Sequence, residues 1–458
     1  MQGHPGANSV GRVSSTLSDL AAKRISAGEA AGLVRSHTWV DYGGILCQPD
    51  VFDKALAARA GELHGVKIRS CLSLRPRAVL EDVPDDGHFF WFSLHFSGYD
   101  RRQHDAGRAH YLPVNLGEVP DYYRRFIEPV DVAVLKTCPM DADGNFNFSA
   151  SSLWHRALLE RAKVVVVEES PGLPYAHGHH NAVHLNEVDH VITGDGAPPP
   201  ELVNPAPTEV DRAVAGFIAA EIDDGACLQI GIGGMPNAVC ESLLGSGVRD
   251  LGVHTEMLTD GLLDLLQAGQ VTGARKSYHP GKITYSFALG SPALYDTIDH
   301  NRDLLCLPVN ETNLPAVIAG NDRVVAINST TQLDLQGQAA SESAGHRHLS
   351  GTGGQLEFVR GAYASRGGKS FVCLASTYER HGVRHSRIVP ELTPGNIVTT
   401  PRTDVMYVVT EFGITCLKGK SVPERARALI SIAHPDFREE LERRAYELGL
   451  IPRGLFAG

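Results

Sequence analysis

The sequence has no pair of cysteines at the C-x-x-C spacing that zinc knuckles and thiol redox motifs use. Its cysteines are isolated from one another, so neither a zinc knuckle nor a redox pair is indicated. Isolated cysteines of this kind are typical small core residues of proteins in a reducing compartment. They are Cys47, Cys71, Cys138, Cys227, Cys240, Cys306, Cys373 and Cys416.

Long apolar runs are also lacking, because no stretch approaches the roughly 20 residues of a transmembrane helix. The N-terminus is polar and has no apolar core of the kind that a secretory signal needs. We interpret residues 1–19 as a mobile tail. We expect a cytoplasmic protein with no membrane partner.

The chain has no excess of positive charge. Its 42 Lys and Arg residues against 53 Asp and Glu residues give a net charge of −11. This balance argues against nucleic acid or an anionic membrane as the main partner, although a local site can still bind a small anion. The chain contains 43% hydrophobic and 21% charged residues, a composition typical of a globular protein. Its length of 458 residues indicates two or three domains.

Short apolar strands alternate with amphipathic helices along the chain, which is typical of an α/β fold. Predicted strands include residues 66–72, 131–137 and 162–169. The proline-rich segment 197–207 can continue neither a helix nor a central strand. We therefore predict an N-terminal domain over residues 20–196, a linker over 197–207 and a C-terminal domain over 208–458.

Three polar segments of the first half need an interpretation. Asp50 is expected to cap a helix that continues through Leu63. The aromatic and polar segment 91–105 is expected to form a surface loop or to line a pocket. Four histidines within residues 175–184 are interpreted as a polar loop, because no His-Glu pair at helical spacing and no nearby cysteine completes a metal site. We therefore predict no metal.

A glycine-rich segment, residues 231–237, follows a predicted strand and precedes a predicted helix. Its backbone N–H groups and the helix N-terminus can bind an anion or an oxyanion. A Rossmann dehydrogenase is the weaker interpretation, because Pro236 stands where a dinucleotide fingerprint has glycine or alanine. A second glycine-rich loop, residues 350–358, again opens toward a helix.

Glu256 lies just after the short apolar run 251–253, and Asp260-Gly261 is expected to turn the chain. A carboxylate at a strand tip beside glycine loops has the groups that acyl transfer through a covalent intermediate requires. Attack on an acyl-CoA gives a mixed anhydride, and the released thiolate can then form a glutamyl-CoA thioester without ATP or metal. Backbone donors would stabilise each oxyanion by about 3–4 kcal/mol apiece. A solvated loop carboxylate is the alternative for Glu256 considered alone.

Several longer motifs occur in a consistent order: Gly231–Val239, His254–Met257 with Asp260-Gly261, Phe287–Gly290, Gly351–Gln355, Val409–Gly413 and Ala433–Arg438. Together they resemble the acetyl-CoA hydrolase/transferase family, and within it the 4-hydroxybutyrate and butyryl-CoA:acetate CoA-transferases. The resemblance covers the chain from about residue 20.

The resemblance implies two similar open α/β domains with the active site at their interface and Glu256 as the residue that forms the thioester. It also implies that CoA is a substrate rather than a permanently bound cofactor, and that the chain assembles as a homodimer or homotetramer. Where the family has a CoA-binding lysine, this chain has Arg380-His381-Gly382. The implied CoA contacts are Gly231, Ile232, Gly233, Gly234, Met235, Thr331, Gly354 and His381, and the implied oxyanion contacts are Ile232, Asn328 and Gly353.

We therefore predict a CoA-transferase that moves CoA between a short-chain acyl-CoA, such as butyryl-CoA or 4-hydroxybutyryl-CoA, and a carboxylate such as acetate. An acyl-CoA hydrolase would use the same residues with water in place of the acceptor. A CoA-binding sensor without turnover is an alternative of another class, although binding alone does not need Glu256.

Overall fold

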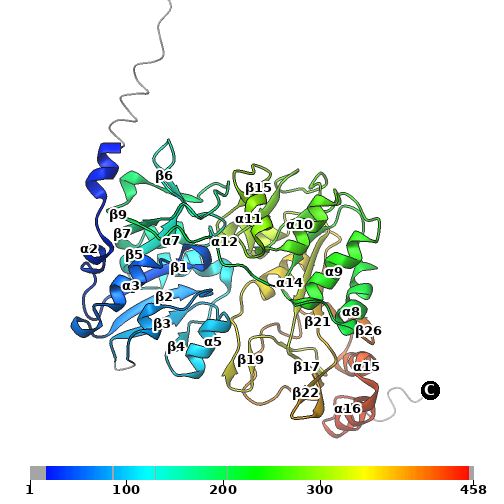
Figure 1. The fold of residues 1–458 in the computed structure, drawn as a ribbon. Helices are drawn as coiled ribbons and strands as arrows, with labels where there is room; N and C mark the ends of the chain where they lie inside the picture. Colours follow the sequence, from blue (N-terminus) through cyan, green and yellow to red (C-terminus); the bar gives the residue numbers. More distant parts are fainter. Residues whose placement is uncertain (1–16, 85–86, 129, 204, 453–458) are drawn as a thin grey trace, which may run out of the picture. The chain divides into compact units, whose positions relative to one another are not determined.

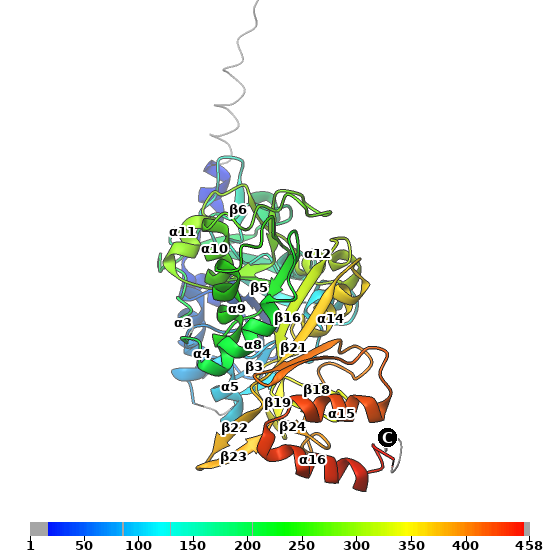
Figure 2. The ribbon, with the colours of Figure 1, turned by 90° about the vertical axis from the view of Figure 1, so that its right-hand side faces the viewer.

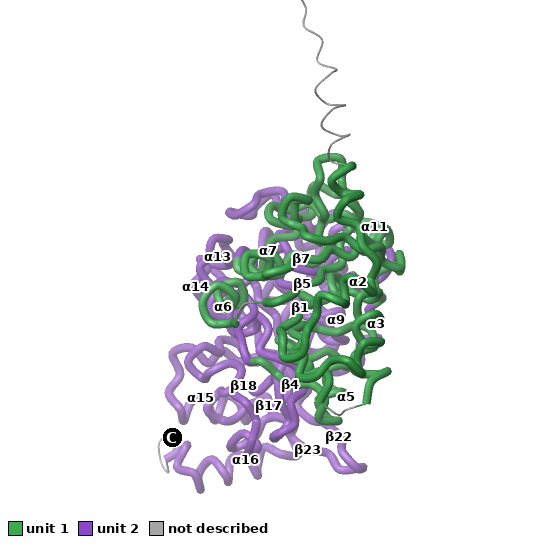
Figure 3. Tube along the Cα trace, turned by 90° about the vertical axis from the view of Figure 1, so that its left-hand side faces the viewer, with its two compact units in different colours: residues 1–112, 118–201, 295–310 green, residues 113–117, 202–294, 311–458 purple. Residues whose placement is uncertain are grey.

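A computed structural model of the chain describes residues 17–84, 87–128, 130–203 and 205–452. Residues 1–16 of the expected tail therefore lie outside the described residues. The chain forms two compact units, coloured green and purple in Figure 3. Unit 1 comprises residues 1–112, 118–201 and 295–310, and unit 2 comprises residues 113–117, 202–294 and 311–458. Among the described residues, no helix combines the length and the apolar character needed to cross a membrane.

Unit 1 is built around a parallel seven-stranded sheet in the order β4-β3-β2-β1-β5-β7-β9 (Figure 1). The chain lays β2, β3 and β4 on one side of β1 and β5, β7 and β9 on the other. The winding therefore reverses beside β1, and open α/β sheets bind ligands at the carboxyl ends of strands at such a reversal. The strands are β1 (Trp39–Gly44), β2 (Val66–Cys71), β3 (Phe89–Ser93), β4 (Ala109–Tyr111), β5 (Val130–Thr137), β7 (Ala162–Glu169) and β9 (His190–Thr193).

Short helices and one antiparallel strand pair accompany this sheet in unit 1. The pair is formed by β6 (Asn145–Asn147) and β8 (Ala182–His184), which are separated in the chain by α7 and β7. The helices are α2 (Ala27–Ala31), α3 (Val51–Ala57), α4 (Ala78–Glu81), α5 (Gly98–Asp105), α6 (Val119–Arg125) and α7 (His155–Leu159).

The expectation for Asp50 is wrong in two respects. Helix α3 ends at Ala57, and the Asp50 carboxylate makes no capping bond to it. Glu168, near the end of β7, does the capping instead, because its carboxylate accepts the N–H groups of Asp50 and Phe52, both at 2.9 Å. The carboxylate of Asp50 is held by nearby cations, as described below.

The expectation of a surface loop over residues 91–105 is also wrong. Trp91 is fully buried in β3, and Gly98–Asp105 forms helix α5. A capping box starts this helix: Ser97 Oγ accepts the Asp100 N–H at 3.1 Å, and Asp100 accepts the Ser97 N–H at 3.0 Å. Local capping chemistry therefore gives this segment regular structure.

Unit 2 contains a six-stranded sheet in the order β11-β10-β16-β21-β25-β26, in which only β26 runs antiparallel. Figure 2 shows α9 and α14 on opposite sides of this sheet. The α/β fold class with parallel sheets is therefore confirmed. The strands are β10 (Cys227–Ile230), β11 (Gly252–Val253), β16 (Val324–Ser329), β21 (Lys369–Cys373), β25 (Tyr407–Thr410) and β26 (Gly413–Cys416).

Helices and small strand pairs surround this sheet. The helices are α8 (Glu209–Ala219), α9 (Gly234–Leu244), α10 (Asp260–Gln267), α13 (Pro315–Ile318), α14 (Gln355–Ala364), α15 (Val422–Ile432) and α16 (Pro435–Glu447). The small strands are β12 (Met257–Leu258), β13 (Ile283–Tyr285), β14 (Phe287–Ala288), β17 (Gln332–Asp334), β18 (Ala339–Ala340), β19 (Ser343–Ala344), β20 (Arg347–His348), β22 (Thr377–Arg380), β23 (Val383–Ser386) and β24 (Ile388–Val389). Residues 292–312 form α11 (Pro292–Ile298), β15 (Leu304–Cys306) and α12 (Val309–Thr312).

Asp260 and Gly261 do not turn the chain as expected, because helix α10 begins at Asp260. The Asp260 carboxylate accepts the Ser291 hydroxyl at 2.6 Å, and Gly261 packs against Cys240 of α9. Ser291 and Cys240 are distant from Asp260 and Gly261 in the sequence. An Asp-Gly pair that locally suggests a turn therefore begins a helix here.

Candidate active site

Glu256 lies where the chain leaves β11, the edge strand of the unit 2 sheet. His254 forms an isolated bridge with Thr284, and β12 then pairs with β14. The backbone carbonyl of Glu256 accepts the N–H groups of Ser286 at 3.0 Å and Phe287 at 3.1 Å. These bonds fix the backbone that carries the carboxylate.

Two donors meet the carboxylate of Glu256. Asn313 Nδ2 donates to Glu256 Oε2 at 2.5 Å, and the Gly354 N–H donates a second hydrogen bond. Gly354 immediately precedes α14, and a Cβ at this position would overlap Glu256 Oε2 and Asn313 Nδ2. Only glycine therefore lets this helix start approach the carboxylate so closely.

The amide of Asn313 is held in one orientation. Its Oδ1 accepts the Thr312 hydroxyl at 2.9 Å, so the N–H₂ group faces Glu256. Glu357, in the first turn of α14, lies 3.4 Å from the same nitrogen and also accepts the Gly117 N–H at 3.0 Å. Asn313 is fully buried, so this donor is shielded from water.

Burial raises the pKa of Glu256 to about 7, and the hydrogen bonds from Asn313 and Gly354 offset only part of that effect. The carboxylate is therefore poised to lose its proton near neutral pH. A carboxylate in this state can act as a nucleophile, and the two donors lie where an oxyanion at its carbon would need them.

The first glycine loop connects β10 to α9 in the same unit. Gly233 has φ of +116°, a conformation that favours glycine, and α9 begins at Gly234. Ile232 is 45% exposed and Met235 is buried. The loop from Gly231 to Met235 therefore forms the start of an 11-residue helix, which is a suitable anion site.

A cavity of about 560 Å³ lies elsewhere in unit 2, and Thr331 lines it. Two arginines, Arg380 and Arg387, also line it. Arg387 donates to the Thr331 carbonyl at 2.9 Å, and its guanidinium lies 5.0 Å from the centre of the Tyr378 ring. Burial lowers the pKa of Arg387. His381 lies beside this site, in the turn between β22 and β23, with φ of +52° and an exposed side chain.

Asn328 and Gly353, two predicted oxyanion contacts, lie in different surroundings. The Asn328 amide pairs with Gln229 on the neighbouring strand, with Nδ2 donating to Gln229 Oε1 at 3.1 Å. Gly353 directly precedes Gly354 and accepts the Leu116 N–H on its carbonyl at 3.1 Å. Their roles, and that of Ile232, stay predictions.

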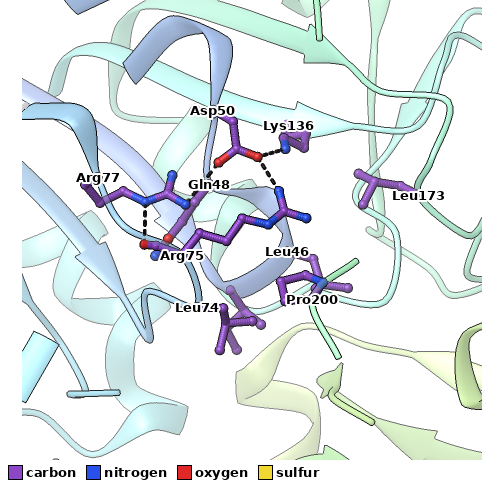
Figure 4. Close-up of a pocket in the computed structure, with 10 residues that line it drawn as sticks. Leu46, Gln48, Asp50, Leu74, Arg75, Arg77, Lys136, Leu173 and Pro200 are labelled. Atoms are coloured by element: carbon purple, nitrogen blue, oxygen red, sulfur yellow. Dashed lines mark hydrogen bonds and ion pairs between the residues drawn. The ribbon is translucent and has the colours of Figure 1, made fainter. Parts of the chain in front are cut away.

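Unit 1 has a polar pocket of its own at the carboxyl ends of β1, β2 and β5 (Figure 4). Arg75, Arg77 and Lys136 all contact the Asp50 carboxylate, with Arg77 at 3.0 Å. The open space is only about 10 Å³, which is room for about one water molecule. The cations are therefore committed to Asp50, and this pocket is a weaker candidate than the surroundings of Glu256.

Two parts of the chain match the two domains of one protein family. The acetyl-CoA hydrolase/transferase N-terminal domain matches residues 14–201, and the C-terminal domain of the same family matches residues 290–445. The chain belongs to the acetyl-CoA hydrolase/transferase family. The resemblance found in the sequence motifs is thus confirmed.

Relatives of known activity and structure support this family assignment. A butyryl-CoA:acetate CoA-transferase of Anaerostipes caccae is 45% identical over 92% of this chain and 95% of that protein. RipA from Yersinia pestis shares 33% sequence identity with this chain. Its crystal structure matches this one with a TM-score of 0.86, covering 95% of this chain and 100% of that chain. A 4-hydroxybutyrate CoA-transferase structure from Porphyromonas gingivalis is 33% identical, with a TM-score of 0.76 over 93% of this chain and 98% of that chain.

The structure brings two of the predicted site residues, Glu256 and Gly354, together as neighbours. It also places Asn313 against Glu256, and the sequence analysis did not predict this residue. Asn313 lies 57 residues after Glu256 (313 − 256), and its only local signal is a polar run, residues 310–313, after an apolar strand. Arg387 was likewise not predicted, because nothing in its local sequence connects it with the other site residues. In the described part of the chain, no group of three or more His, Cys, Asp or Glu side chains could hold a metal ion.

Proposed function

We propose that the protein is a CoA-transferase that moves CoA between a short-chain acyl-CoA and a carboxylate through a glutamyl-CoA thioester at Glu256. The observation that carries the proposal is the Glu256 carboxylate with the Asn313 amide and the Gly354 N–H directed at it. The activities of the relatives support the same reaction class.

The reaction begins with attack of a Glu256 carboxylate oxygen on the thioester carbonyl carbon. The C–S bond breaks, CoA leaves as the thiolate, and a mixed anhydride between Glu256 and the acyl group forms. The thiolate then attacks the Glu256 carbonyl carbon, and the first carboxylate leaves. An incoming carboxylate reverses both steps and departs as the new acyl-CoA, so one thioester is exchanged for another.

Each attack at the Glu256 carbon creates a tetrahedral oxyanion. We assign the donors to this oxyanion to Asn313 Nδ2 and the Gly354 N–H, because Glu256 Oε2 already lies against both groups. Such a donor contributes about 3–4 kcal/mol in studied enzymes. The contributions predicted for Ile232, Asn328 and Gly353 would then concern the oxyanion on the acyl group.

We assign CoA to two parts of unit 2. The loop Gly231–Met235 offers backbone N–H groups at a helix start, and the 560 Å³ cavity offers Arg380 and Arg387 beside Thr331. Arginines suit phosphate groups because the guanidinium can donate two parallel hydrogen bonds. Gly354 and His381 complete the predicted contacts.

The acids exchanged are proposed from the relatives: butyryl-CoA or 4-hydroxybutyryl-CoA as donor and acetate as acceptor. Assembly as a homodimer or homotetramer and a cytoplasmic location stay predictions of the sequence. Light scattering on the purified protein tests the assembly.

The thioester is tested by incubating the protein with butyryl-CoA, reducing it with borohydride and digesting it for mass spectrometry. We expect a reduced Glu256 in the wild-type protein and none in Glu256→Ala, which should also lose turnover. An unmodified Glu256, together with turnover by Glu256→Ala, would overturn the mechanism.

Initial rates then separate a transferase from a hydrolase. A transferase should release butyrate from butyryl-CoA at a rate that depends on acetate and should form acetyl-CoA in equal amount. CoA release at the same rate without acetate would instead indicate a hydrolase. Binding of CoA with no turnover would indicate a sensor.

A further inference from the structure

A chain of buried hydrogen bonds leads from Lys276 toward Glu256. The Lys276 ammonium donates to the Val253 carbonyl at 2.8 Å, to the Lys282 carbonyl at 2.7 Å and to Thr284 Oγ1 at 3.2 Å. All three donors of the ammonium are therefore used, in a side chain whose residue is only 6% exposed. Burying a charge is costly, so filling space alone does not account for a lysine here.

His254 receives the next bond in this chain. Thr284 Oγ1 lies 2.9 Å from His254 Nδ1, and His254 Nε2 lies 2.8 Å from the Thr312 carbonyl. A carbonyl can only accept, so Nε2 carries the proton and Nδ1 accepts from the threonine hydroxyl. The Thr284 hydroxyl has a second acceptor in the Val253 carbonyl, but this lies at 3.4 Å, so the hydroxyl proton is directed at the nearer His254 Nδ1.

His254 stays neutral in this position. Burial, together with the charge of Lys276, lowers its pKa to about 3. A single tautomer, with the proton on Nε2, is therefore present across the physiological pH range.

The last links join this histidine to the nucleophile. His254 holds the Thr312 carbonyl, the Thr312 hydroxyl holds Asn313 Oδ1, and Asn313 Nδ2 meets Glu256. We propose that Lys276, Thr284 and His254 are positioning residues, which hold the Asn313 amide in place against Glu256 during thioester formation. This inference rests on the proposed roles of Glu256 and Asn313.

The test uses Thr284, which is fully buried, because valine keeps its shape and removes only the hydroxyl. Thr284→Val leaves His254 Nδ1 without its donor, whereas Thr284→Ser keeps the hydroxyl and is the matched control. We expect Thr284→Val to slow formation of the Glu256 thioester by about ten- to a hundredfold, because small displacements of a reacting group have effects of this size. The KM for butyryl-CoA should stay within about twofold, and Thr284→Ser should stay within about threefold of wild type in rate.

A second pair of variants tests the next link. The Gln side chain can place an N–H donor close to the position of His254 Nε2, but Asn is too short to do so. His254→Gln should therefore keep most of the thioester rate, and His254→Asn should lose it with little change in KM. A loss caused only by poorer packing would appear in Thr284→Ser, which lacks the methyl group, rather than in Thr284→Val, and it would appear in both His254 variants.

The outcomes separate this inference from the proposed function. If the wild-type protein forms no thioester at Glu256, the proposed function fails first. If it does, and Thr284→Val forms it at the wild-type rate, the positioning role is wrong and the proposed function stands. Equal losses in Thr284→Val and Thr284→Ser would also overturn the positioning role. Should Thr284→Val not fold, the His254 pair decides by the same criterion.

Discussion

At the scale of single residues, Glu256 must lose its proton before it can act as a nucleophile. Its pKa is raised to about 7 by burial. The rate of thioester formation should therefore increase with pH through about 7 and then level off. Single-turnover rates measured by rapid quench between pH 5.5 and 8.5 check this, and a rate independent of pH over that range would contradict it.

The same shift has a consequence for folding. The raised pKa means that the folded protein holds this proton more tightly than the unfolded chain, whose glutamate has its ordinary pKa of 4.5. The folded state therefore loses up to about 3 kcal/mol of relative stability as the pH rises from about 4.5 to 7. Glu256→Gln removes this titration. The variant should therefore be more stable relative to wild type at pH 8 than at pH 5, as judged by the difference between their free energies of unfolding. Denaturant unfolding at the two pH values measures the difference.

Gly354 allows a third prediction at the same scale. Gly354→Ala would place a methyl group on top of Glu256 Oε2 and Asn313 Nδ2, so the carboxylate or the amide must move. We expect a loss of about 10²- to 10³-fold in kcat, as for removal of one oxyanion donor. Gly216→Ala is the matched control, because a Cβ there meets nothing within 4 Å in the middle of α8. The control should keep full activity and gain roughly 0.5–1 kcal/mol in stability.

At the scale of elements, Asp50 joins the start of α3 to the loop that follows β2 and to strand β5. Its carboxylate binds Arg75, Arg77 and Lys136, and the last two are almost fully buried. Asp50→Asn should cost about 3–5 kcal/mol in the free energy of unfolding, because it leaves buried cations without their counter-charge. Asp121→Asn, which breaks a solvent-exposed pair with Arg125, should cost less than about 1 kcal/mol. Urea unfolding of the two variants makes the comparison, and equal costs would show that the Asp50 cluster contributes no more than a surface pair.

The elements also show what a sequence can predict. Buried parallel strands such as β5 and β7 follow from their apolar runs, and the start of α8 follows from the capping box of Thr208 and Asp211. The cap of α3 could not be predicted, because Glu168 reaches it from a strand more than a hundred residues away. Asn313, which donates to Glu256, could not be predicted for the same physical reason. Local patterns report backbone preference, but a site depends on which distant side chains packing brings together.

At the scale of the whole molecule, the two units do not follow the chain in a simple way. Residues 113–117 and 295–310 each belong to the unit formed mainly by the other half of the sequence. The proline-rich segment near residue 200 marks a change between halves, but nothing local marks these two exchanged segments. One of them, residues 113–117, supplies the Gly117 N–H that holds Glu357 beside Asn313. The candidate site therefore draws on sequence from both halves, although all of these residues belong to unit 2.

This organisation predicts where CoA should protect the molecule. The residues assigned to CoA all lie in unit 2: in the loop 231–235, around the cavity that Arg380 and Arg387 line, and at Gly354 beside Glu256. Hydrogen exchange with and without CoA should therefore show slower exchange at these segments. At a CoA concentration of about 100 times Kd, the stabilisation of the folded state should approach 2.7 kcal/mol.

Arg387 provides the decisive variant for this prediction. Arg387→Met removes a guanidinium that lines the cavity and should weaken CoA binding and abolish protection around residues 331–345. Arg384→Met is the control, because Arg384 lies on β23, which ends just before Arg387, but is exposed and pairs with Asp436. It should leave CoA binding and protection unchanged. Unaltered protection in Arg387→Met would place CoA outside this cavity, while the role of Glu256, which the mass-spectrometric test addresses separately, would be unaffected.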